Sequence, residues 1–360
     1  GEVSEEAIDS KVERILRLAA RVGKLAETTS TKAKQFTNTE LQEIARKIGS
    51  QSIVLAKNEN LVLPLESAKS IAVIGAHARF GRGQGGGSAT VYPTEFVAPL
   101  EGLTSNAPTG TSIQYTLGVN ADTGLIQFDK NYLKNPVTGT GGCLAEVVAP
   151  DGSILLSENR FGGFFNWATQ PWMFQYKFIR VSGVFTADKD GEYQFGVGMV
   201  GNYKVTIGDV VHEGFIPMHS DDLGEFVLNP PCRSFGHTLR KGEEVLLQWE
   251  YPQGSLPIPI ASFLIGFREP SRSQAEEFLD ATALAAKSDV AIVFVGTTAE
   301  IESEGHDRKD ISLPDGQDQL VSAVAKVAKR TIVVVNAGSP VEMPWFDEVD
   351  SVLFTYFGGQ

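Results

Sequence analysis

Three glutamates stand close together in residues 300–314, which read Glu-Ile-Glu-Ser-Glu-Gly-His-Asp-Arg-Lys-Asp-Ile-Ser-Leu-Pro. The segment follows an apolar run, residues 290–295, that is typical of a buried parallel strand. Open α/β sheets bind ligands beyond the carboxyl ends of their strands, so the segment is well placed for chemistry. A partly desolvated carboxyl group there could keep its proton near neutral pH and act as a general acid. A solvated charged loop is the plainer interpretation, and composition alone favours it.

Strand and helix patterns alternate on both sides of this segment. Apolar runs typical of buried strands stand at residues 71–74, 112–117, 290–295, 332–335 and 352–356. Helical spacing predicts helices over residues 4–23, from residue 38 onward, over 274–286 and over 316–328. We expect the second helix to bury an apolar face that includes Ile53 and Val54, and residues 57–65 to form a loop. These patterns predict an open, mostly parallel α/β sandwich.

The pattern changes between residues 123 and 268. Short runs there alternate apolar and polar residues and are separated by Gly, Asp, Asn and Pro, as at 181–185, 191–197, 203–207 and 244–251. Alternation with period two and frequent turns predicts an antiparallel β-sandwich inserted into the α/β fold. We therefore expect four consecutive segments along the chain, at residues 1–35, 36–122, 123–268 and 269–360.

Several motifs occur in a characteristic order. Glu-Gly-His-Asp-Arg is followed by Ile-Ser-Leu-Pro and Gln317, and further motifs stand at residues 58–65, 85–89, 99–102 and 338–345. Together they resemble glycoside hydrolase family 3, which comprises retaining β-glucosidases, β-xylosidases and related exo-acting enzymes. Residues 184–195 resemble the protective-antigen-type sandwich domain inserted in some family 3 β-glucosidases. There the insert covers part of the active-site entrance and restricts substrate length.

The resemblance implies a role for each acidic residue of the motif. Retaining β-glycosidases use one carboxyl group as a nucleophile and another as an acid/base. By the family pattern the acid/base is Glu304, directly before the glycine. Glu302 is the alternative, and Glu300 is more distant. Asp307 and Arg308 are expected to brace the loop, and His306 to be a surface or loop-packing imidazole.

The same resemblance implies that this chain carries half of a catalytic pair. In the family the nucleophile is an aspartate on a catalytic barrel, in a Ser-Asp context. The Ser-Asp pairs of this chain, at residues 220–221 and 288–289, fall in the predicted sandwich and at a strand start, so neither fits the end of a barrel strand. Residues 1–35 then correspond to the end of the barrel and a linker, and the barrel itself precedes residue 1. Residues 269–360 correspond to a truncated second part of the α/β sandwich. We expect the chain alone not to hydrolyse glycosides.

A glycine-rich stretch, residues 81–87, has the form G-x-G-x-x-G. A dinucleotide-binding loop would need these glycines at a strand end and at the start of a helix, and the following Ser-Ala-Thr-Val-Tyr-Pro cannot start one. The resemblance implies that the stretch lines the mouth of a sugar pocket, where Arg82, Gln84 and Ser88 would bind substrate hydroxyls. Trp172 is a further substrate-binding candidate. It lies in an aromatic-rich segment, residues 161–176, most of whose rings are expected in the core.

Composition excludes some classes of partner. The chain has 360 residues, 42% of them apolar, and a net charge of -13, which argues against a nucleic-acid or anionic-membrane partner. No apolar run approaches the roughly 18 residues of a membrane span. The two cysteines, Cys143 and Cys232, form neither a disulfide framework nor a metal-ligand cluster, and no cofactor or metal is expected. The absence of an N-glycosylation acceptor slightly favours a cytoplasmic over a secreted protein.

Two other functions stay open at this point. A carbohydrate-binding module without catalysis would rest on the predicted β-sandwich and its aromatic residues. A flavodoxin-like nucleotide binder would rest on the glycine-rich stretch alone. The sequence does not define the preferred sugar or linkage, and a homo-oligomer is compatible with it.

Overall fold

The computed structural model describes residues 3–25, 34–65, 68–91, 96–120, 125–219, 221, 223–270, 272–304 and 307–359. The chain divides into two compact units, Gly1–Gln51 and Ser52–Gln360. Each unit is described by itself. In the described part of the chain, no helix is both long and apolar enough to cross a membrane.

The first unit contains two helices. Helix α1 spans Glu5–Arg21, and the Ser4 side chain caps it by accepting a hydrogen bond from the Ala7 amide at 3.2 Å. Helix α2 spans Asn38–Ser52 and begins with Thr37 and Glu40 bonded reciprocally, as in a capping box. Helix α1 is found where the sequence predicts it, and α2 begins at the predicted position. Neither has a buried residue, so their apolar stripes are exposed in this chain.

The second unit contains a six-stranded sheet with strand order β1-β18-β17-β16-β2-β3. Its strands are β1 (Val54–Asn58), β2 (Ser70–Ile74), β3 (Ser112–Thr116), β16 (Val290–Gly296), β17 (Thr331–Asn336) and β18 (Ser351–Phe354). All neighbours pair in parallel except β1 and β18, which are antiparallel. This confirms the predicted open, mostly parallel α/β fold.

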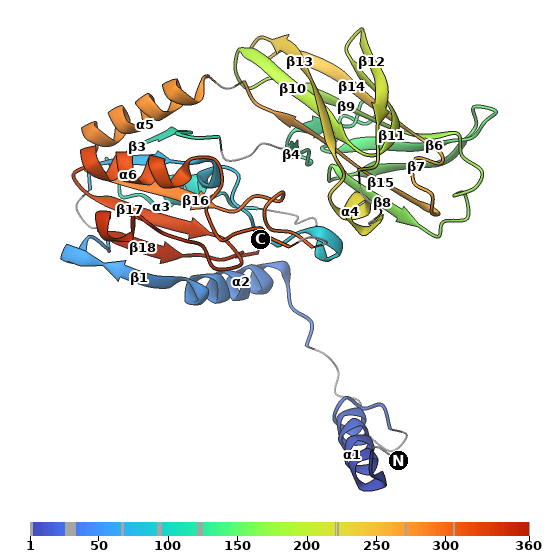
Figure 1. The fold of residues 1–360 in the computed structure, drawn as a ribbon, viewed down its shortest axis with the longest axis horizontal. Coiled ribbons are helices and arrows are strands. Elements are labelled where there is room, and N and C mark those ends of the chain that lie inside the picture. Colours follow the sequence, from blue (N-terminus) through green and yellow to red (C-terminus); the bar gives the residue numbers. More distant parts are fainter. Residues whose placement is uncertain are drawn as a thin grey trace. The chain divides into compact units, whose positions relative to one another are not determined.

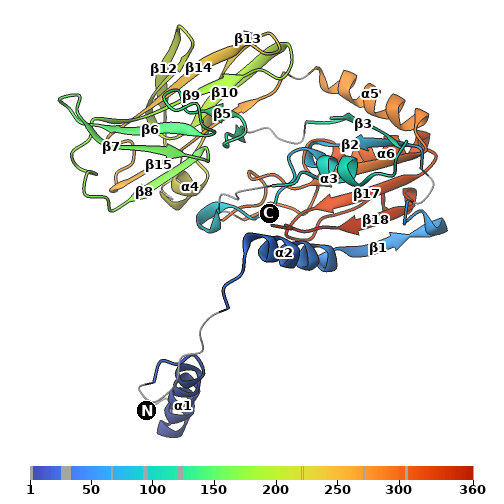
Figure 2. The ribbon, with the colours of Figure 1, turned by 180° about the vertical axis from the view of Figure 1, so that it is seen from behind.

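Three helices cover the two faces of this sheet (Figures 1 and 2). They are α3 (Pro99–Asn106), α5 (Gln274–Lys287) and α6 (Gln317–Val327). Helices α5 and α6 pack on one face with Ala291 and Val293, while α3 packs on the other with Ile292 and Phe294. Because both faces are covered, every residue of β16 is buried. That is why its sequence is a continuous apolar run.

Strand β1 and helix α3 correct the sequence-based expectation. The sequence predicts a second helix that includes Val54 and a loop at residues 57–65. In the structure α2 ends at Ser52, and Val54–Asn58 pairs with the edge of β18. A β-branched residue fits a pleated edge better than a helix end, and the partner strand is distant in sequence. Helix α3 was not predicted; it is short and begins at Pro99, which suits a first helical turn.

Residues 126–268 form two antiparallel sheets and one short helix. A five-stranded sheet contains β4 (Ile126–Gln127), β8 (Phe164–Ala168), β10 (Gly191–Gly198), β13 (Cys232–Leu239) and β15 (Ile260–Arg268). A seven-stranded sheet contains β5 (Leu133–Lys134), β6 (Cys143–Val148), β7 (Ile154–Arg160), β9 (Phe178–Thr186), β11 (Gly201–Ile207), β12 (Val210–Ile216) and β14 (Glu244–Pro252). Helix α4 spans Leu223–Leu228. Their shared core includes Phe128, Phe185, Phe195, Trp249 and Phe267. The predicted antiparallel sandwich is therefore present.

The order of the parallel strands defines where a ligand can bind. From β2 the chain moves outward to β3, whereas from β16 it moves the opposite way to β17 and β18. Strands β2 and β16 are neighbours, so the direction of winding reverses between them. A crevice at such a switch point, beyond the carboxyl ends of the strands, is the usual ligand site of an open α/β sheet. The glycine-rich stretch follows β2 and the acidic segment follows β16.

Candidate functional site

The glycine-rich stretch and the acidic segment meet at this switch point. Gly87 has a φ of +66°, and a Cβ atom added to it would lie 2.5 Å from both Cβ and Oε2 of Glu304. The Glu304 side chain thus lies directly on the backbone of Gly87. At Gly86, an added Cβ atom would lie 3.8 Å from Oγ of Ser303. The glycines here permit close approach of two loops, as glycine does at other tight contacts.

Glu302 is held by donors from two other loops. Its Oε2 accepts hydrogen bonds from Thr297 Oγ1 at 2.5 Å and from the Gly338 amide at 3.1 Å, and its Oε1 accepts one from Ser339 Oγ at 2.6 Å. Burial alone would raise the pKa of this carboxyl group. The hydrogen bonds from Ser339 and Thr297 lower the pKa most, and the Gly338 amide and the Arg82 charge lower it further. Together they outweigh the effect of burial, so the pKa of Glu302 lies below its usual value. Glu302 is therefore a fixed carboxylate.

Arg82 donates to the protein's own backbone. Its Nη1 donates to the Thr298 carbonyl at 3.1 Å, and its Nη2 donates to the carbonyls of Gly85 at 3.0 Å and Glu302 at 2.8 Å. The guanidinium also lies 4.7 Å from the ring centroid of Phe357. Arg82 thus joins the glycine-rich stretch to the acidic segment. Binding of substrate hydroxyls by Arg82 stays a prediction.

Gln84 also bonds within its own loop. Its Nε2 donates to the Val91 carbonyl at 2.7 Å, and its Oε1 accepts from the Val91 amide at 2.9 Å. The amide therefore closes the loop that contains the glycines. Ser88 lies in a short 3-10 turn, Gly87–Ala89, and its side chain is outside the described part of the structure. His306 also lies outside the described residues.

Asn336 is a positioning residue that the sequence analysis missed. It ends β17, and its Oδ1 accepts from the Arg82 amide at 2.6 Å. Its Nδ2 donates to the carbonyls of Arg82 at 3.0 Å and Tyr356 at 2.5 Å. One side chain thus ties the glycine-rich stretch to the exits of β17 and β18. An Asn at the end of an apolar run, before Ala-Gly-Ser-Pro, is the signal that could have found it.

Arg308, within the acidic segment at residues 300–314, and Gln317, just after it, bond to residues just after β17 and at the end of β16. Arg308 Nη1 donates to Ser339 Oγ and to the Pro340 carbonyl, both at 3.0 Å. Gln317 accepts from the Gly296 amide at 2.8 Å and donates to the Gly296 carbonyl at 2.9 Å. Arg308 therefore has the kind of contacts expected of a bracing residue.

His77 is buried beneath the glycine-rich stretch. Its Nε2 lies 3.0 Å from the Thr297 carbonyl, which fits a neutral ring with the proton on Nε2. Burial lowers the pKa of His77 to about 4; the hydrogen bond to Thr297 opposes this, and the Arg82 charge adds to it. The ring thus stays neutral at physiological pH.

A cavity of about 550 Å³ adjoins these loops. Its walls come from residues 81–84 of the glycine-rich stretch, from residues 297–300 after β16 and from residues 125–127 and 129, which include β4. The volume is within the range of small-molecule sites. In the part of the chain that the structure describes, no group of three or more His, Cys, Asp or Glu side chains could hold a metal ion.

Trp172 belongs to the β-sandwich. Its ring is partly buried, packs against the sandwich core and makes edge contacts with Trp167 and Tyr176, at centroid distances of 6.0 and 5.5 Å. Most rings of residues 161–176 are likewise packed, but Phe161 and Phe174 are 55% and 78% exposed. The structure therefore brings together Arg82, Gln84, Glu302 and Glu304, while Trp172 makes its described contacts within the sandwich.

Known proteins are similar to this chain in sequence and in fold. The chain is 30% identical over 384 residues to "Probable beta-glucosidase I" of Emericella nidulans and 30% identical over 383 residues to "Beta-glucosidase B" of the same organism. The alignments cover 99% and 100% of this chain and 44% of each relative, so the chain spans less than half their length.

The crystal structure of β-glucosidase from Kluyveromyces marxianus in complex with glucose is similar, with a TM-score of 0.78 and 25% identity. That match covers 99% of this chain and 44% of the crystallised one. Residues 53–360 match the sequence model described as "Glycosyl hydrolase family 3 C-terminal domain". This match spans most of the chain, including both loops of the switch point, and the chain therefore belongs to glycosyl hydrolase family 3.

Proposed function

We propose that the complete protein is a retaining, exo-acting β-glucosidase that removes terminal β-D-glucosyl residues from oligosaccharides or aryl glucosides. Family membership and the names of the relatives support this proposal, as does the glucose in the crystal structure of the Kluyveromyces protein. Since the chain spans 44% of its relatives, the nucleophilic aspartate is assigned to a barrel domain outside it. In the complete protein, residues 1–35 would end that barrel, and residues 123–268 would interrupt the second domain formed by 36–122 and 269–360.

Within this chain, Glu304 is the proposed acid/base. The observation that carries the assignment is the place of Glu304, directly against Gly87 of the glycine-rich stretch. Glu302, the alternative, is anchored by three hydrogen bonds from Thr297, Gly338 and Ser339. A carboxylate so held, with a lowered pKa, is a poor proton donor. Glu304 is exposed and lies on the glycine-rich stretch, where a substrate can approach it.

The chemistry requires one group to serve twice. In the first step Glu304 donates its proton to the departing glycosidic oxygen while the nucleophilic carboxylate bonds to the anomeric carbon. In the second step the Glu304 carboxylate takes a proton from water, whose oxygen attacks the same carbon and releases the enzyme. The two carboxyl groups of a retaining enzyme stand about 5–5.5 Å apart, so the barrel must place its aspartate at that distance from Glu304.

The test uses the complete protein with Glu304→Gly and, as a matched variant two residues away, Glu302→Gln. Proton donation matters most for poor leaving groups, so Glu304→Gly should lower kcat/KM for an alkyl glucoside about 10²- to 10⁴-fold and for a dinitrophenyl glucoside far less. Azide should restore turnover of the activated substrate and give β-glucosyl azide. Glu302→Gln should affect both substrates alike and show no azide rescue. If the leaving-group dependence and the azide rescue belong to Glu302→Gln instead, the assignment is reversed.

A second test addresses the missing nucleophile. Residues 1–360 alone are expected to release no glucose from an aryl β-glucoside. Hydrolysis by this chain that disappears with Glu304→Gly would show that the chain contains its own nucleophile.

A carbohydrate-binding module without catalysis is the alternative, and the exposed rings of Phe161 and Phe174 favour it. Exposed aromatic faces can stack on sugar rings. If the complete protein binds cellobiose through these two residues and hydrolyses no glucoside, the alternative replaces the enzyme. The measurement is calorimetric titration of the Phe161→Ala/Phe174→Ala double variant and the unsubstituted protein.

A further inference from the structure

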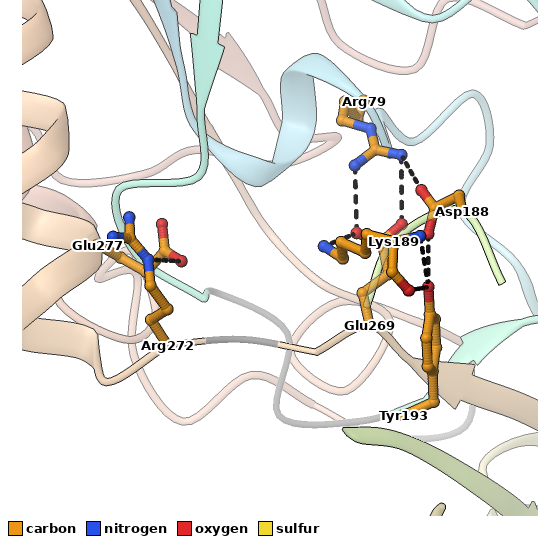
Figure 3. A network of polar contacts seen from close by, with 7 residues as sticks. All are labelled: Arg79, Asp188, Lys189, Tyr193, Glu269, Arg272 and Glu277. Carbon is orange, nitrogen blue, oxygen red and sulfur yellow. Dashed lines mark hydrogen bonds and ion pairs between the residues drawn. The ribbon is translucent and has the colours of Figure 1, made fainter. Parts of the chain in front are cut away.

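Four charged side chains form a cluster between the sandwich and the α/β fold (Figure 3). Arg79 donates to both oxygens of Glu269, from Nη1 at 3.1 Å and from Nη2 at 3.2 Å, and its Nη2 lies 3.8 Å from Asp188 Oδ2. Lys189 Nζ donates to Glu269 Oε2 at 2.8 Å. The Tyr193 hydroxyl donates to Asp188 Oδ1 at 2.6 Å. We name Arg79, Asp188, Lys189 and Glu269 the junction cluster.

The members of the junction cluster come from three separate parts of the chain. Arg79 directly follows the 3-10 turn Ala76–Ala78 and stands two residues before the glycine-rich stretch. Asp188 and Lys189 lie in the turn between β9 and β10 of the sandwich. Glu269 follows β15, where the chain returns from the sandwich to the α/β fold. The cluster therefore fastens the sandwich to the fold right beside the loop that carries the glycines.

The cluster is built to hold a fixed geometry. Glu269 is 13% exposed and Arg79 is 33% exposed, so water screens their pairing less than on an open surface. The two parallel hydrogen bonds between Arg79 and Glu269 fix orientation as well as distance. The Arg79 guanidinium also lies 5.0 and 5.8 Å from the ring centroids of Phe80 and Tyr115. Without the Glu269 charge, the cations of Arg79 and Lys189 would be left without the anion that they share.

The attachment matters because the sandwich forms one wall of the cavity beside the switch point. That wall is made of residues 125–127 and 129, and it faces residues 81–84 and 297–300. The opposing walls continue into the stretch that touches Glu304. A rotation of the sandwich about its two connections would widen or narrow this cavity while leaving Glu302 and Glu304 in place.

We propose that the junction cluster is a positioning device that sets the width of this cavity and so determines how well the protein binds substrates longer than one glucosyl unit. The proposal rests on the proposed function. Sugar units beyond the first one extend away from the acid/base and would contact the sandwich wall. A wall that is held loosely contacts them less well, and the loss should appear in KM rather than in kcat.

The experiment compares Glu269→Gln with Arg272→Gln in the complete protein. A second cavity, of about 580 Å³, is lined by Arg79, Lys189 and Glu269 of the cluster and also by Arg272. Arg272 is a matched control because it lines this cavity but pairs with Glu277 and Asp280, which both belong to α5. Glu269→Gln keeps the shape of the side chain and removes its charge. It should raise KM for cellotriose about 3- to 10-fold while leaving kcat within 2-fold and changing KM for an aryl glucoside less. Arg272→Gln should change none of these values by more than 2-fold.

A second readout does not depend on glucosidase activity. Amide hydrogen exchange of the complete protein should become at least 3-fold faster in residues 186–191 and 265–270 of Glu269→Gln and stay unchanged in the core strand β16. Unchanged exchange in those segments, or an equal effect of Arg272→Gln, would overturn the junction cluster as a positioning device. Faster exchange in a protein that hydrolyses no glucoside would keep the attachment, refute the proposed function and remove the claim about substrate length. Faster exchange with an unchanged KM for cellotriose would refute only the claim about substrate length.

Discussion

Gly87→Ala is the most direct probe of the contact between the glycine-rich stretch and Glu304. The substitution adds one methyl group at a position with a φ of +66°. The added carbon would lie 2.5 Å from both Cβ and Oε2 of Glu304, so the carboxyl group must move. Ordinary contact between such atoms begins near 3.4 Å, so the displacement is about 1 Å.

Two effects of different size follow from this geometry. Left-handed backbone costs a residue with a Cβ atom about 1–2 kcal/mol, which lowers stability. A displacement of about 1 Å in a catalytic group can cost about 100-fold in rate. Gly139→Ala separates the two effects, because Gly139 has a φ of +71° and an added Cβ atom there would have no neighbour within 4 Å. It should lose similar stability and no activity.

The assay is kcat/KM of the complete protein on an alkyl β-glucoside, measured with thermal unfolding of each variant. Gly87→Ala should lose about 100-fold in kcat/KM and Gly139→Ala less than 2-fold, with melting temperatures lowered in both. If Gly87→Ala retains kcat/KM within 2-fold, the Glu304 side chain does not act from the position that the structure gives it. If both variants lose activity equally, the loss reflects stability and the argument from the contact fails.

Two further predictions concern stability. The pKa of His77 is lowered to about 4 from 6.5 in an unfolded chain, so the unfolded state binds the extra proton below pH 6.5 and stability falls as pH drops. Between pH 7.5 and pH 5 the free energy of unfolding, measured with urea, should fall by about 2 kcal/mol because of His77. His77→Gln should abolish this part of the pH dependence, and a variant with the same pH dependence as the unsubstituted protein would contradict the prediction. Asn336→Ala removes three hydrogen bonds to part-buried backbone groups of Arg82 and Tyr356 and should cost about 2 kcal/mol, whereas the exposed Asn131→Ala should cost less than about 0.5 kcal/mol. Equal losses in these two variants would remove Asn336 as the residue that holds the loops.

The parallel strands of this fold could be predicted because a strand that is buried on both faces has a continuous apolar run in its own sequence. Strand β16 is covered on both faces, and its sequence is accordingly apolar at every position up to Gly296. Strand β1 could not be predicted in the same way. It exists because β18 offers a free edge to which Val54–Asn58 can bond, and that edge lies almost 300 residues later in the chain. Helical spacing alone places Val54 at the end of a helix and residues 57–65 in a loop.

The candidate site could likewise be predicted only in part. The proximity of residues 81–87 to the acidic segment follows from two strand ends and one switch point, which the sequence shows. The partners of individual side chains do not follow from it. Arg82 and Gln84 carry donors suited to sugar hydroxyls, yet those donors meet backbone carbonyls that only the folded loops place within reach. Asn336 was missed for the same reason, because an amide that bonds three backbone groups looks like any other Asn in sequence.

The two glutamates of one loop illustrate how a fold can place a proposed acid and an anchor in different environments. Glu302 and Glu304 are chemically identical and two residues apart, so side-chain type cannot distinguish them. Glu302 faces the exits of β16 and β17, where Thr297, Gly338 and Ser339 supply three donors that favour the charged form. Glu304 faces Gly87, whose missing side chain leaves room for a carboxyl group and for the substrate that must reach it. Environments that differ in this way are how proteins assign different roles to like carboxyl groups. If Glu304 is the acid/base, as we propose, the anchor is as necessary as the acid, because a loop held by Glu302 would keep Glu304 at a fixed distance from the nucleophile.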